Sequence, residues 1–342
     1  MSTPTLRSRG ALALLLALVV APLSAACGSA SGAGSGGGAG ASASSATRTV
    51  TDVEGTAMQV PAEPQRVVAL SEPTLDGALA LGVTPVGTIT GRGQSTVPHY
   101  LADRAGDLPI LGGVANPNYE AIAKAKPDLI LVDGTSINNN PDAIAILRKI
   151  APTFYAGYAG GDWRATFSLV ADALNKKSAA TQVVATYDAK VAQTRKALGA
   201  TYAGKTFSVV RWQGGSASVI LKELPAGQAL TDLVLARPKS QDKRGRGHSE
   251  PISLENLDQI DADYLFFGTL GGSSNGNPDA GGSSDKDGAA AALNEARSVP
   301  GFSALKAVTA GHVITVDGSL WTSTGGPILM QGLVDDVKAA LS

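Results

Sequence analysis

The chain has 342 residues, with 28 Lys and Arg against 29 Asp and Glu and a formal net charge of −1. This near balance argues against a general nucleic-acid-binding protein, which would carry an excess of basic residues, so no nucleic-acid partner is expected. The single cysteine excludes an intramolecular disulfide framework and any Cys-based zinc or iron–sulfur site.

Residues 1–26 have the pattern of an export signal: two arginines precede an apolar run that is too short to span a bilayer. Small residues then lead into Cys27, in a placement that resembles a bacterial lipobox. Residues 27–50 are mostly Gly, Ser and Ala and predict a flexible tether, because such a segment buries too little apolar surface to offset its ordering entropy. We expect Cys27 to carry a lipid anchor; an ordinary signal peptide with a chance cysteine is the alternative.

Residues 51–160 predict a first α/β lobe. Short apolar, β-branched runs bounded by turns predict strands at 66–70, 85–89 and 128–132. Pro and Gly residues mark the ends of two intervening helices, at 74–81 and 119–126. Strands that alternate with helices indicate a parallel sheet.

Residues 161–200 predict a long connecting helix. They contain few helix breakers, and their apolar residues recur mostly at helical spacing, with 175–178 as the one point of interruption. Such a stiff connection between two lobes resists a wide hinge motion. We therefore expect a preformed cleft between the lobes that closes only modestly.

Residues 201–342 predict a second lobe of the same plan, with strands at 205–211 and 264–267 and a helix at 226–235. Residues 118–130 align with 253–265, and in both segments a Glu, Glu120 or Glu255, precedes by eight residues the Asp that opens a strand. The alignment indicates an internal duplication of whole lobes rather than a short repeat.

Several short motifs follow one another in a fixed order. They are Pro64-Gln65-Arg66, Leu81-Gly82-Val83, Pro117-Asn118-Tyr119-Glu120, Lys126-Pro127-Asp128, Ile150-Ala151-Pro152, Arg237-Pro238, Ser253-Leu254-Glu255, Asp261-Ala262-Asp263 and Gly325-Gly326-Pro327. With these motifs the chain, over about residues 50–342, resembles the iron–siderophore substrate-binding lipoproteins of actinobacterial ABC importers. The resemblance implies the class III periplasmic-binding fold, which is α/β with two Rossmann-like lobes joined by a long helical connector. It also implies a ferric siderophore bound between the lobes, against loops at the carboxyl ends of the strands.

A ferric siderophore already supplies the oxygen ligands of its iron, so no metal-ligating residue, catalytic residue or cofactor is expected in the protein. The protein needs cations for the polarised oxygens around the iron and flat apolar surface for the chelator body. The candidates on the expected cleft loops are Arg92, Tyr100, Arg211, Trp212, Arg237 and Trp321, with His99 beside Tyr100. Packing at a strand end or a solvated charge is the alternative for each.

The basic stretch 237–248 has two interpretations. It could steer an anionic chelate toward the cleft, or it could be a solvated surface loop.

The resemblance further implies an ABC permease as partner, with Glu120 and Glu255 on the outer surfaces of the two lobes docking onto permease arginines. A Glu that simply favours the first turn of a helix is the alternative for either residue alone. If Cys27 is acylated, the mature protein is held at the outer face of the cytoplasmic membrane, where we expect it to act as a monomer.

The sequence gives less support to other functions. The chain shows no P-loop, nucleophile elbow or His-Glu-x-x-His motif, so an enzyme is not expected, and its three His residues form no cluster for a zinc or manganese receptor. A receptor of the same fold for cobalamin or haem stays open, as does a cell-envelope interaction protein that no longer transports. The sequence leaves open whether the chelator is hydroxamate, catecholate, citrate-like or mixed, and which permease receives it.

Overall fold

The computed structural model describes residues 46–137, 140–272 and 282–342, all within one structural unit, Ser45–Ser342. The predicted signal peptide, Cys27 and nearly all of the predicted tether lie outside the described residues. Across the described ranges, no helix combines the length and the apolar character needed to cross a bilayer.

The first lobe is built on a four-stranded sheet in the spatial order β4-β3-β7-β8, with every neighbouring pair parallel. Its strands are β3 (Val67–Ala69), β4 (Gly87–Thr88), β7 (Leu129–Val132) and β8 (Thr153–Tyr155). All four residues of β7 are fully buried, as expected for a parallel strand covered on both faces. Two small antiparallel pairs add to this lobe: β1 (Thr47–Thr51) with β2 (Ala57–Pro61), and β5 (Gly112–Gly113) with β6 (Asn116–Pro117).

Short helices connect these strands, and side-chain caps mark where three of them begin. Ser71, Asn118 and Asn140 each accept a hydrogen bond from a backbone N–H of the first turn of their helix, and so satisfy donors that the helix leaves unpaired. The helices are α1 (Glu72–Ala80), the 3₁₀ helix η1 (His99–Leu101), α2 (Ala102–Ala105), α3 (Tyr119–Lys124), α4 (Gly134–Ile137) and α5 (Pro141–Arg148).

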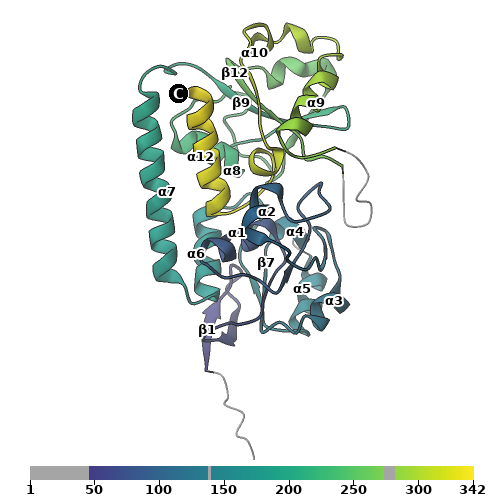
Figure 1. Cartoon of the computed structure of the whole chain (residues 1–342), viewed down its shortest axis with the longest axis vertical. Coiled ribbons are helices and arrows are strands. Elements are labelled where there is room, and N and C mark those ends of the chain that lie inside the picture. The colour runs from purple at the N-terminus through teal and green to yellow at the C-terminus, as the bar shows by residue number, and fades with distance from the viewer. Residues whose placement is uncertain (1–45, 138–139, 273–281) are drawn as a thin grey trace, which may run out of the picture. The chain divides into compact units, whose positions relative to one another are not determined.

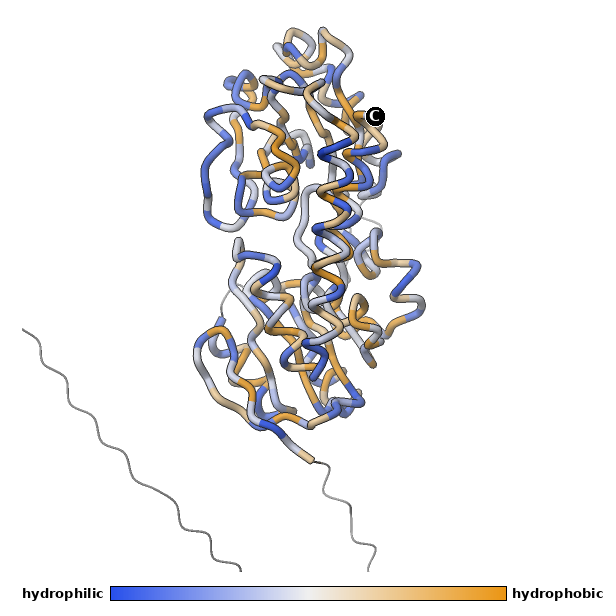
Figure 2. The backbone as a smooth tube through the Cα atoms, turned by 90° about the vertical axis from the view of Figure 1, so that its left-hand side faces the viewer, coloured by the Kyte–Doolittle hydropathy of each residue, from blue (hydrophilic) through white to orange (hydrophobic). Residues whose placement is uncertain are grey.

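The connection between the lobes consists of two helices, and the break between them overlaps the stretch 175–178, which the sequence marked as the point of interruption. The helices are α6 (Trp163–Ala173) and α7 (Lys177–Leu198). The break falls where Asn175 adopts a left-handed conformation with φ of 58°, which ends α6 and redirects the chain. In Figure 1, α7 runs beside both lobes. Figure 2 shows polar and apolar residues interspersed along it, and its buried residues, such as Tyr187, Val191 and Leu198, are spaced as on one face of a helix.

The second lobe is built on a five-stranded sheet in the spatial order β11-β10-β9-β12-β13. Its strands are β9 (Phe207–Gln213), β10 (Ser216–Val219), β11 (Glu250–Ile252), β12 (Tyr264–Gly268) and β13 (Val313–Thr315). The strands β9, β12 and β13 are parallel, whereas β10 and β11 pair antiparallel. The β9–β10 hairpin turns through Gly214 and Gly215, both with positive φ, as a two-residue type I′ turn requires.

The C-terminal helix α12 (Pro327–Leu341) joins the two lobes. It packs against α7, against α1 of the first lobe and against α8 of the second, and its apolar face lies in one continuous core with theirs. The remaining helices of the second lobe are α8 (Pro225–Asp232), η2 (Leu254–Ile260), α9 (Lys286–Ala296), η3 (Phe302–Ala304), α10 (Lys306–Thr309) and α11 (Gly318–Trp321).

The duplicated segments adopt matching structures. In the first lobe, α3 leads into β7, and the Asp128 carboxylate accepts hydrogen bonds from the backbone just before the neighbouring strand β3. In the second lobe, η2 leads into β12, and Asp263 binds Thr206 just before the neighbouring strand β9. The two aspartates therefore make equivalent hydrogen bonds in the two lobes. The predicted fold class, two α/β lobes with a helical connection, is confirmed.

Candidate functional site

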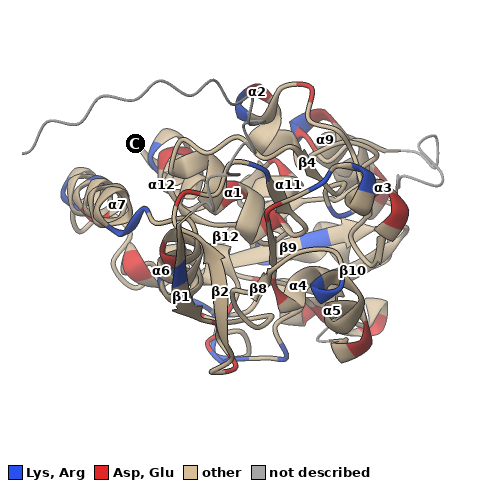
Figure 3. Cartoon of the chain, turned by 90° about the horizontal axis from the view of Figure 1, so that it is seen from below, with Lys and Arg blue, Asp and Glu red and all other residues tan. Residues whose placement is uncertain are grey.

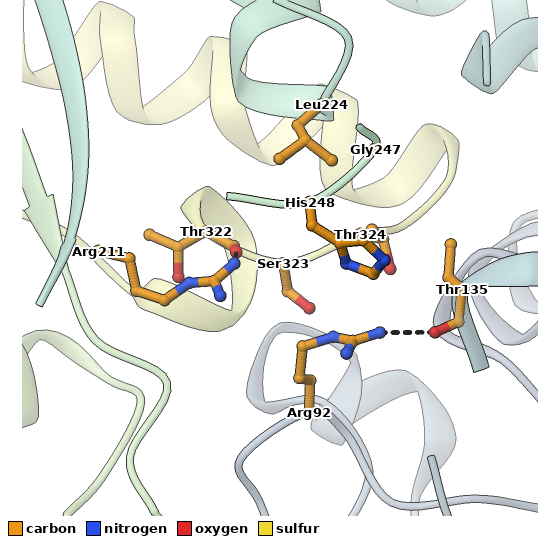
Figure 4. Close-up of a pocket in the computed structure, with 9 residues that line it drawn as sticks. All are labelled: Arg92, Thr135, Arg211, Leu224, Gly247, His248, Thr322, Ser323 and Thr324. Carbon is orange, nitrogen blue, oxygen red and sulfur yellow. Dashed lines mark hydrogen bonds between the residues drawn. The ribbon is translucent and has the colours of Figure 1, made fainter. Parts of the chain in front are cut away.

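A small pocket lies where loops of the two lobes meet (Figure 4). The residues that line it are Arg92, Thr135, Arg211, Leu224, Gly247, His248, Thr322, Ser323 and Thr324. Most of them follow the carboxyl ends of strands, which is where open α/β sheets place their ligands. The pocket has a volume of about 30 Å³, well below the roughly 300–1,000 Å³ of pockets for drug-sized ligands.

Arg92 enters the pocket from the first lobe, on the loop after β4. Its guanidinium donates a hydrogen bond of 2.7 Å to the backbone carbonyl of Thr135, which follows β7. Its own backbone N–H donates to Glu72 Oε1 at 2.7 Å. The backbone of Arg92 is thus held by α1 and its side chain by the residues after β7, and no carboxylate among the described residues pairs with the guanidinium.

Arg211 enters from the second lobe, on strand β9. Its guanidinium donates to the carbonyl of Thr322, and its buried Nε has no hydrogen-bond partner among the described residues. Burial, and secondarily the nearby Arg92 charge, lowers the pKa of Arg211 to about 10, so the side chain stays charged at neutral pH. Two permanent positive charges from different lobes thus line one pocket to which the described residues contribute no acidic side chain.

Glu72 ties the two sides of this pocket together. It lies in the first turn of α1 and is 3% exposed. One oxygen accepts the N–H of Arg92, and the other accepts the hydroxyls of Ser323, at 2.6 Å, and Thr324, at 2.8 Å. Since both oxygens are occupied, Glu72 acts as an internal clamp between the lobes rather than as a group offered to a ligand.

A second buried carboxylate positions the loop that carries His248. Glu223 accepts hydrogen bonds from the backbone N–H groups of Gly245 and Gly247. Gly247 has a φ of 77°, and a Cβ added there would lie 2.6 Å from the backbone of Ala159. Only glycine therefore lets this loop pack so closely against residue 159 and present His248 to the pocket.

Trp212 does not face the pocket, contrary to our expectation. The strand β9 extends beyond Arg211, and successive side chains of a strand point to opposite faces of the sheet. Arg211 therefore faces the pocket, while Trp212 is fully buried against Phe267 and Phe302 on the other face.

Trp321 and Arg237 are also structural in this arrangement and do not line the pocket. Trp321 is 1% exposed, stacks on Phe266 with ring centroids 4.0 Å apart, and donates its indole N–H to Asp336 on α12. Arg237 is 7% exposed and donates to the carbonyl of Ile220 and to Gln241. Both side chains are buried, and neither lines the pocket.

Tyr100 and His99 connect the lobes instead of lining the pocket. The Tyr100 hydroxyl donates to Asp76 on α1, whose carboxylate also accepts the backbone N–H groups of Ile328 and Leu329 at the start of α12. His99 Nδ1 lies 2.6 Å from Asp317, and this contact raises the pKa of the imidazole.

The basic stretch 237–248 divides among several roles. Arg237 is buried, Lys243 pairs with Glu250, and Arg244 donates to the carbonyl of Gly160. Arg246 is exposed. Of the whole stretch, only Gly247 and His248 line the pocket.

Glu120 and Glu255 occupy equivalent, exposed positions. Each is the second residue after the capping side chain of its helix, Asn118 for α3 and Ser253 for η2. Charged residues of both signs are interspersed over the face seen in Figure 3.

The lining residues that sequence reasoning did not single out are mainly small and uncharged: Thr135, Leu224, Thr322, Ser323 and Thr324. Hydroxyl residues are common in any loop, so nothing in a single sequence distinguishes those that face a pocket. The run Thr322-Ser323-Thr324, in a loop that follows a predicted strand, is the one available signal.

Three comparisons place the chain among known proteins. Residues 67–320 match the family model described as periplasmic binding protein. The chain is 31% identical to the probable siderophore-binding lipoprotein YfiY of Bacillus subtilis, over 85% of this chain and 87% of that protein. It is 25% identical to the petrobactin-binding protein YclQ of the same organism, over 85% and 86%.

Among solved structures, Staphylococcus aureus SirA complexed with staphyloferrin B superposes with a TM-score of 0.71 at 28% identity, covering 86% of this chain and 98% of that one. The family model, the relatives and the solved structure all point to the same family, and the relatives match over most of both chains. The chain belongs to the periplasmic binding protein family.

Proposed function

We propose that this protein captures a ferric siderophore between its two lobes and delivers it to an ABC importer. The observation that carries the proposal is the convergence of Arg92 and Arg211, from different lobes, on one pocket whose described lining includes no acidic residue. A guanidinium is permanently charged and offers several N–H donors in a fixed plane, which suits the oxygen atoms around a chelated ferric ion.

The pocket chemistry favours an anionic chelate. Arg211 lacks a carboxylate partner among the described residues, and its buried Nε has no acceptor. Ligand oxygens would supply both, and charge-assisted hydrogen bonds are the stronger kind. The hydroxyls of Ser323 and Thr324 add uncharged polar contacts beside them.

The relatives support the same function. YfiY is named as a probable siderophore-binding lipoprotein, and the SirA structure contains staphyloferrin B. In this chain we infer that Cys27 is acylated and anchors the mature protein, a monomer, at the outer face of the cytoplasmic membrane. We infer that Glu120 and Glu255 dock onto the permease, one from each lobe.

Ligand entry requires the pocket to widen. A volume of about 30 Å³ admits roughly one water molecule, so a siderophore can enter only after contacts between the lobes separate. The hydrogen bonds of Glu72 to Ser323 and Thr324, two residues that line the pocket, are among these contacts.

A binding panel tests this proposal. Ferric citrate, ferric enterobactin, ferrioxamine B, cobalamin and haem are titrated against the protein, and tryptophan fluorescence is measured. We expect saturable quenching by at least one anionic ferric chelate and none by cobalamin or haem. Quenching by cobalamin or haem alone would overturn the siderophore assignment, and failure of every compound to bind a folded protein would favour a non-transporting envelope protein.

A further inference from the structure

We propose that His248 is a third ligand-binding residue of the pocket, and that binding of an anionic ferric chelate places a proton on its imidazole. This inference rests on the proposed function and adds a proton to the binding reaction.

The first support is the position of His248. It lines the same pocket as Arg92 and Arg211, and Figure 4 shows its ring pointing toward the Arg92 guanidinium. Its backbone position is fixed, because Glu223 holds the N–H of the preceding Gly247. The imidazole is thus presented to the pocket by a buried anchor rather than by a freely moving loop.

The second support is the set of charges around the ring. Arg92 faces it from the loop after β4, Arg211 from β9, and Arg246 from its own loop, and all three are positive. The nearby carboxylates are already engaged: Glu72 by Arg92, Ser323 and Thr324, and Glu223 by two backbone N–H groups. A third carboxylate, Asp133 at the end of β7, accepts the N–H and the hydroxyl of Thr135.

These surroundings disfavour the charged imidazole while the pocket holds no anion. His248 as a whole residue is exposed, so its ring is only partly shielded from water. Partial burial, followed by the charges of Arg92, Arg211 and Arg246, lowers the pKa of His248 below its ordinary value. An anionic chelate would offset those charges and offer an acceptor to the ring, which raises the pKa of His248 in the complex.

The direction of the pH dependence follows from linkage. Because the pKa of His248 is higher in the complex than in the free protein, the added affinity is complete below the free-protein pKa and is lost as pH rises through the pKa in the complex. A rise of one pKa unit corresponds to a change in Kd of up to about tenfold.

The titration of the imidazole can be followed directly, since the chain has only three His residues. Proton NMR of the imidazole signals is recorded across pH in the free protein and in the protein saturated with the diamagnetic Ga(III) form of the chelate, with H248Q for assignment. We expect His248 to titrate below about 6.5 in the free protein and to move upward on binding. His99 gives an internal reference on the other side of that value, because Asp317 raises its pKa. An unchanged or lowered pKa of His248 in the complex would overturn the inference.

Affinity measurements provide the second readout. The Kd of the ferric chelate is measured at pH 5.5 and pH 7.5 for the wild type, for H248Q and for H312Q, whose ring stacks on Tyr264 outside the pocket. We expect H248Q to lose up to about tenfold in affinity at pH 5.5 and less than about twofold at pH 7.5, and H312Q to behave as wild type. An equal effect of H248Q at both pH values would overturn the proton coupling while leaving siderophore binding intact. Failure of every chelate to bind the wild type would instead overturn the proposed function and this inference with it.

Discussion

Two positive charges beside one pocket repel each other, and the groups around Arg92 and Arg211 offset part of this repulsion. Each guanidinium binds a backbone carbonyl, of Thr135 or of Thr322. Glu72 supplies a negative charge that acts on Arg211 and accepts the backbone N–H of Arg92, without lining the pocket. Removing one partner of such a set leaves the other charge uncompensated. Arg92, Arg211 and Glu72 therefore form one coupled set of charges, and a substitution at one of them affects the other two.

The structure assigns Trp321 to the core rather than to the ligand pocket, and the variant W321F tests this assignment. In W321F the indole N–H to Asp336 is lost and the smaller ring leaves a gap beside Phe266. We expect the free energy of unfolding to fall by about 1–3 kcal/mol, with the Kd of the chelate unchanged within about twofold. Chemical denaturation and ligand titration on the same variant measure both quantities. A large loss of affinity in a variant that remains stable would show that Trp321 contacts the ligand.

The backbone conformation of Val234 indicates that replacing this residue with glycine would stabilise the protein. It follows the end of α8 with a φ of 60° and is 73% exposed, so a β-branched side chain stands in the left-handed region with little packing to compensate. We expect V234G to raise the free energy of unfolding by about 1 kcal/mol. V234A, which keeps a Cβ, is the matched control and should gain less; a V234G protein no more stable than V234A would contradict the strain argument.

At the scale of elements, helix α1 carries two buried carboxylates that bind across to the other side of the molecule. Glu72 binds the segment before α12, and Asp76, one turn later, accepts the first N–H groups of α12 itself. One helix of the first lobe thus caps a helix that packs with the second.

The raised pKa of Asp76 leads us to expect that the stability of the protein depends on pH. Burial raises its pKa to about 6, despite the N–H groups of Ile328, Leu329 and Gly326 that lower it, and burial raises the pKa of Asp133 to about 6 as well. A carboxyl group whose pKa is raised on folding stabilises the protein below its unfolded pKa of about 4, and this stabilisation is lost as pH rises to about 6, by up to about 3 kcal/mol for each group.

The test compares urea unfolding of the wild type and D76N between pH 4 and pH 6.5. Because D76N is expected to be less stable overall, the slope against pH is compared rather than the absolute value. We expect a shallower fall in the variant, and an identical slope would show that Asp76 does not titrate in this range. Below pH 4 the trend reverses for Asp263, because the lowered pKa of that group makes it stabilising only while ionised.

How far the sequence predicts this site depends on the element concerned. The strands at the centre of the parallel sheet were predictable, because a continuous apolar run such as 129–132, bounded by turns, is typical of a strand buried on both faces. Arg92 and Arg211, which the structure brings into one pocket, were candidates because they lie at carboxyl strand ends. Trp212 was misplaced because β9 was expected to end at Arg211. With the strand continued to Gln213, alternation alone puts the two residues on opposite faces.

Other features depend on contacts that no local pattern records. Arg237 and Trp321 resemble exposed site residues in the sequence, but their partners, Ile220 and Asp336, are 17 and 15 residues away and identify them as structural only once the chain has folded. The small size of the pocket likewise follows from Glu72 binding residues 251 and 252 positions later.

At the scale of the whole molecule, the duplication of lobes gives two equivalent outer surfaces. Glu120 and Glu255 stand at the same place in the two copies, each exposed in the first turn after a capping side chain. A partner with two similar halves could bind both.

The double variant E120A/E255A tests this docking role. We expect chelate binding in solution to match the wild type, because neither residue lies at the pocket, and uptake of the radioactive ferric chelate by cells to fall severalfold or more. The matched control is D142A/D258A, which removes one other exposed acid from each lobe and should transport normally. Wild-type uptake by E120A/E255A would argue against docking through these residues.

The central claim is that Arg92 and Arg211 hold one anionic ferric chelate from opposite lobes. Isothermal titration of the chelate into R92M, R211M and the control R246M, which removes an exposed arginine of the neighbouring loop, tests it most directly. The account predicts that R92M and R211M each weaken binding by about 10–100-fold, while R246M stays within about threefold of wild type. Wild-type affinity in both R92M and R211M, with the fold intact, would contradict it.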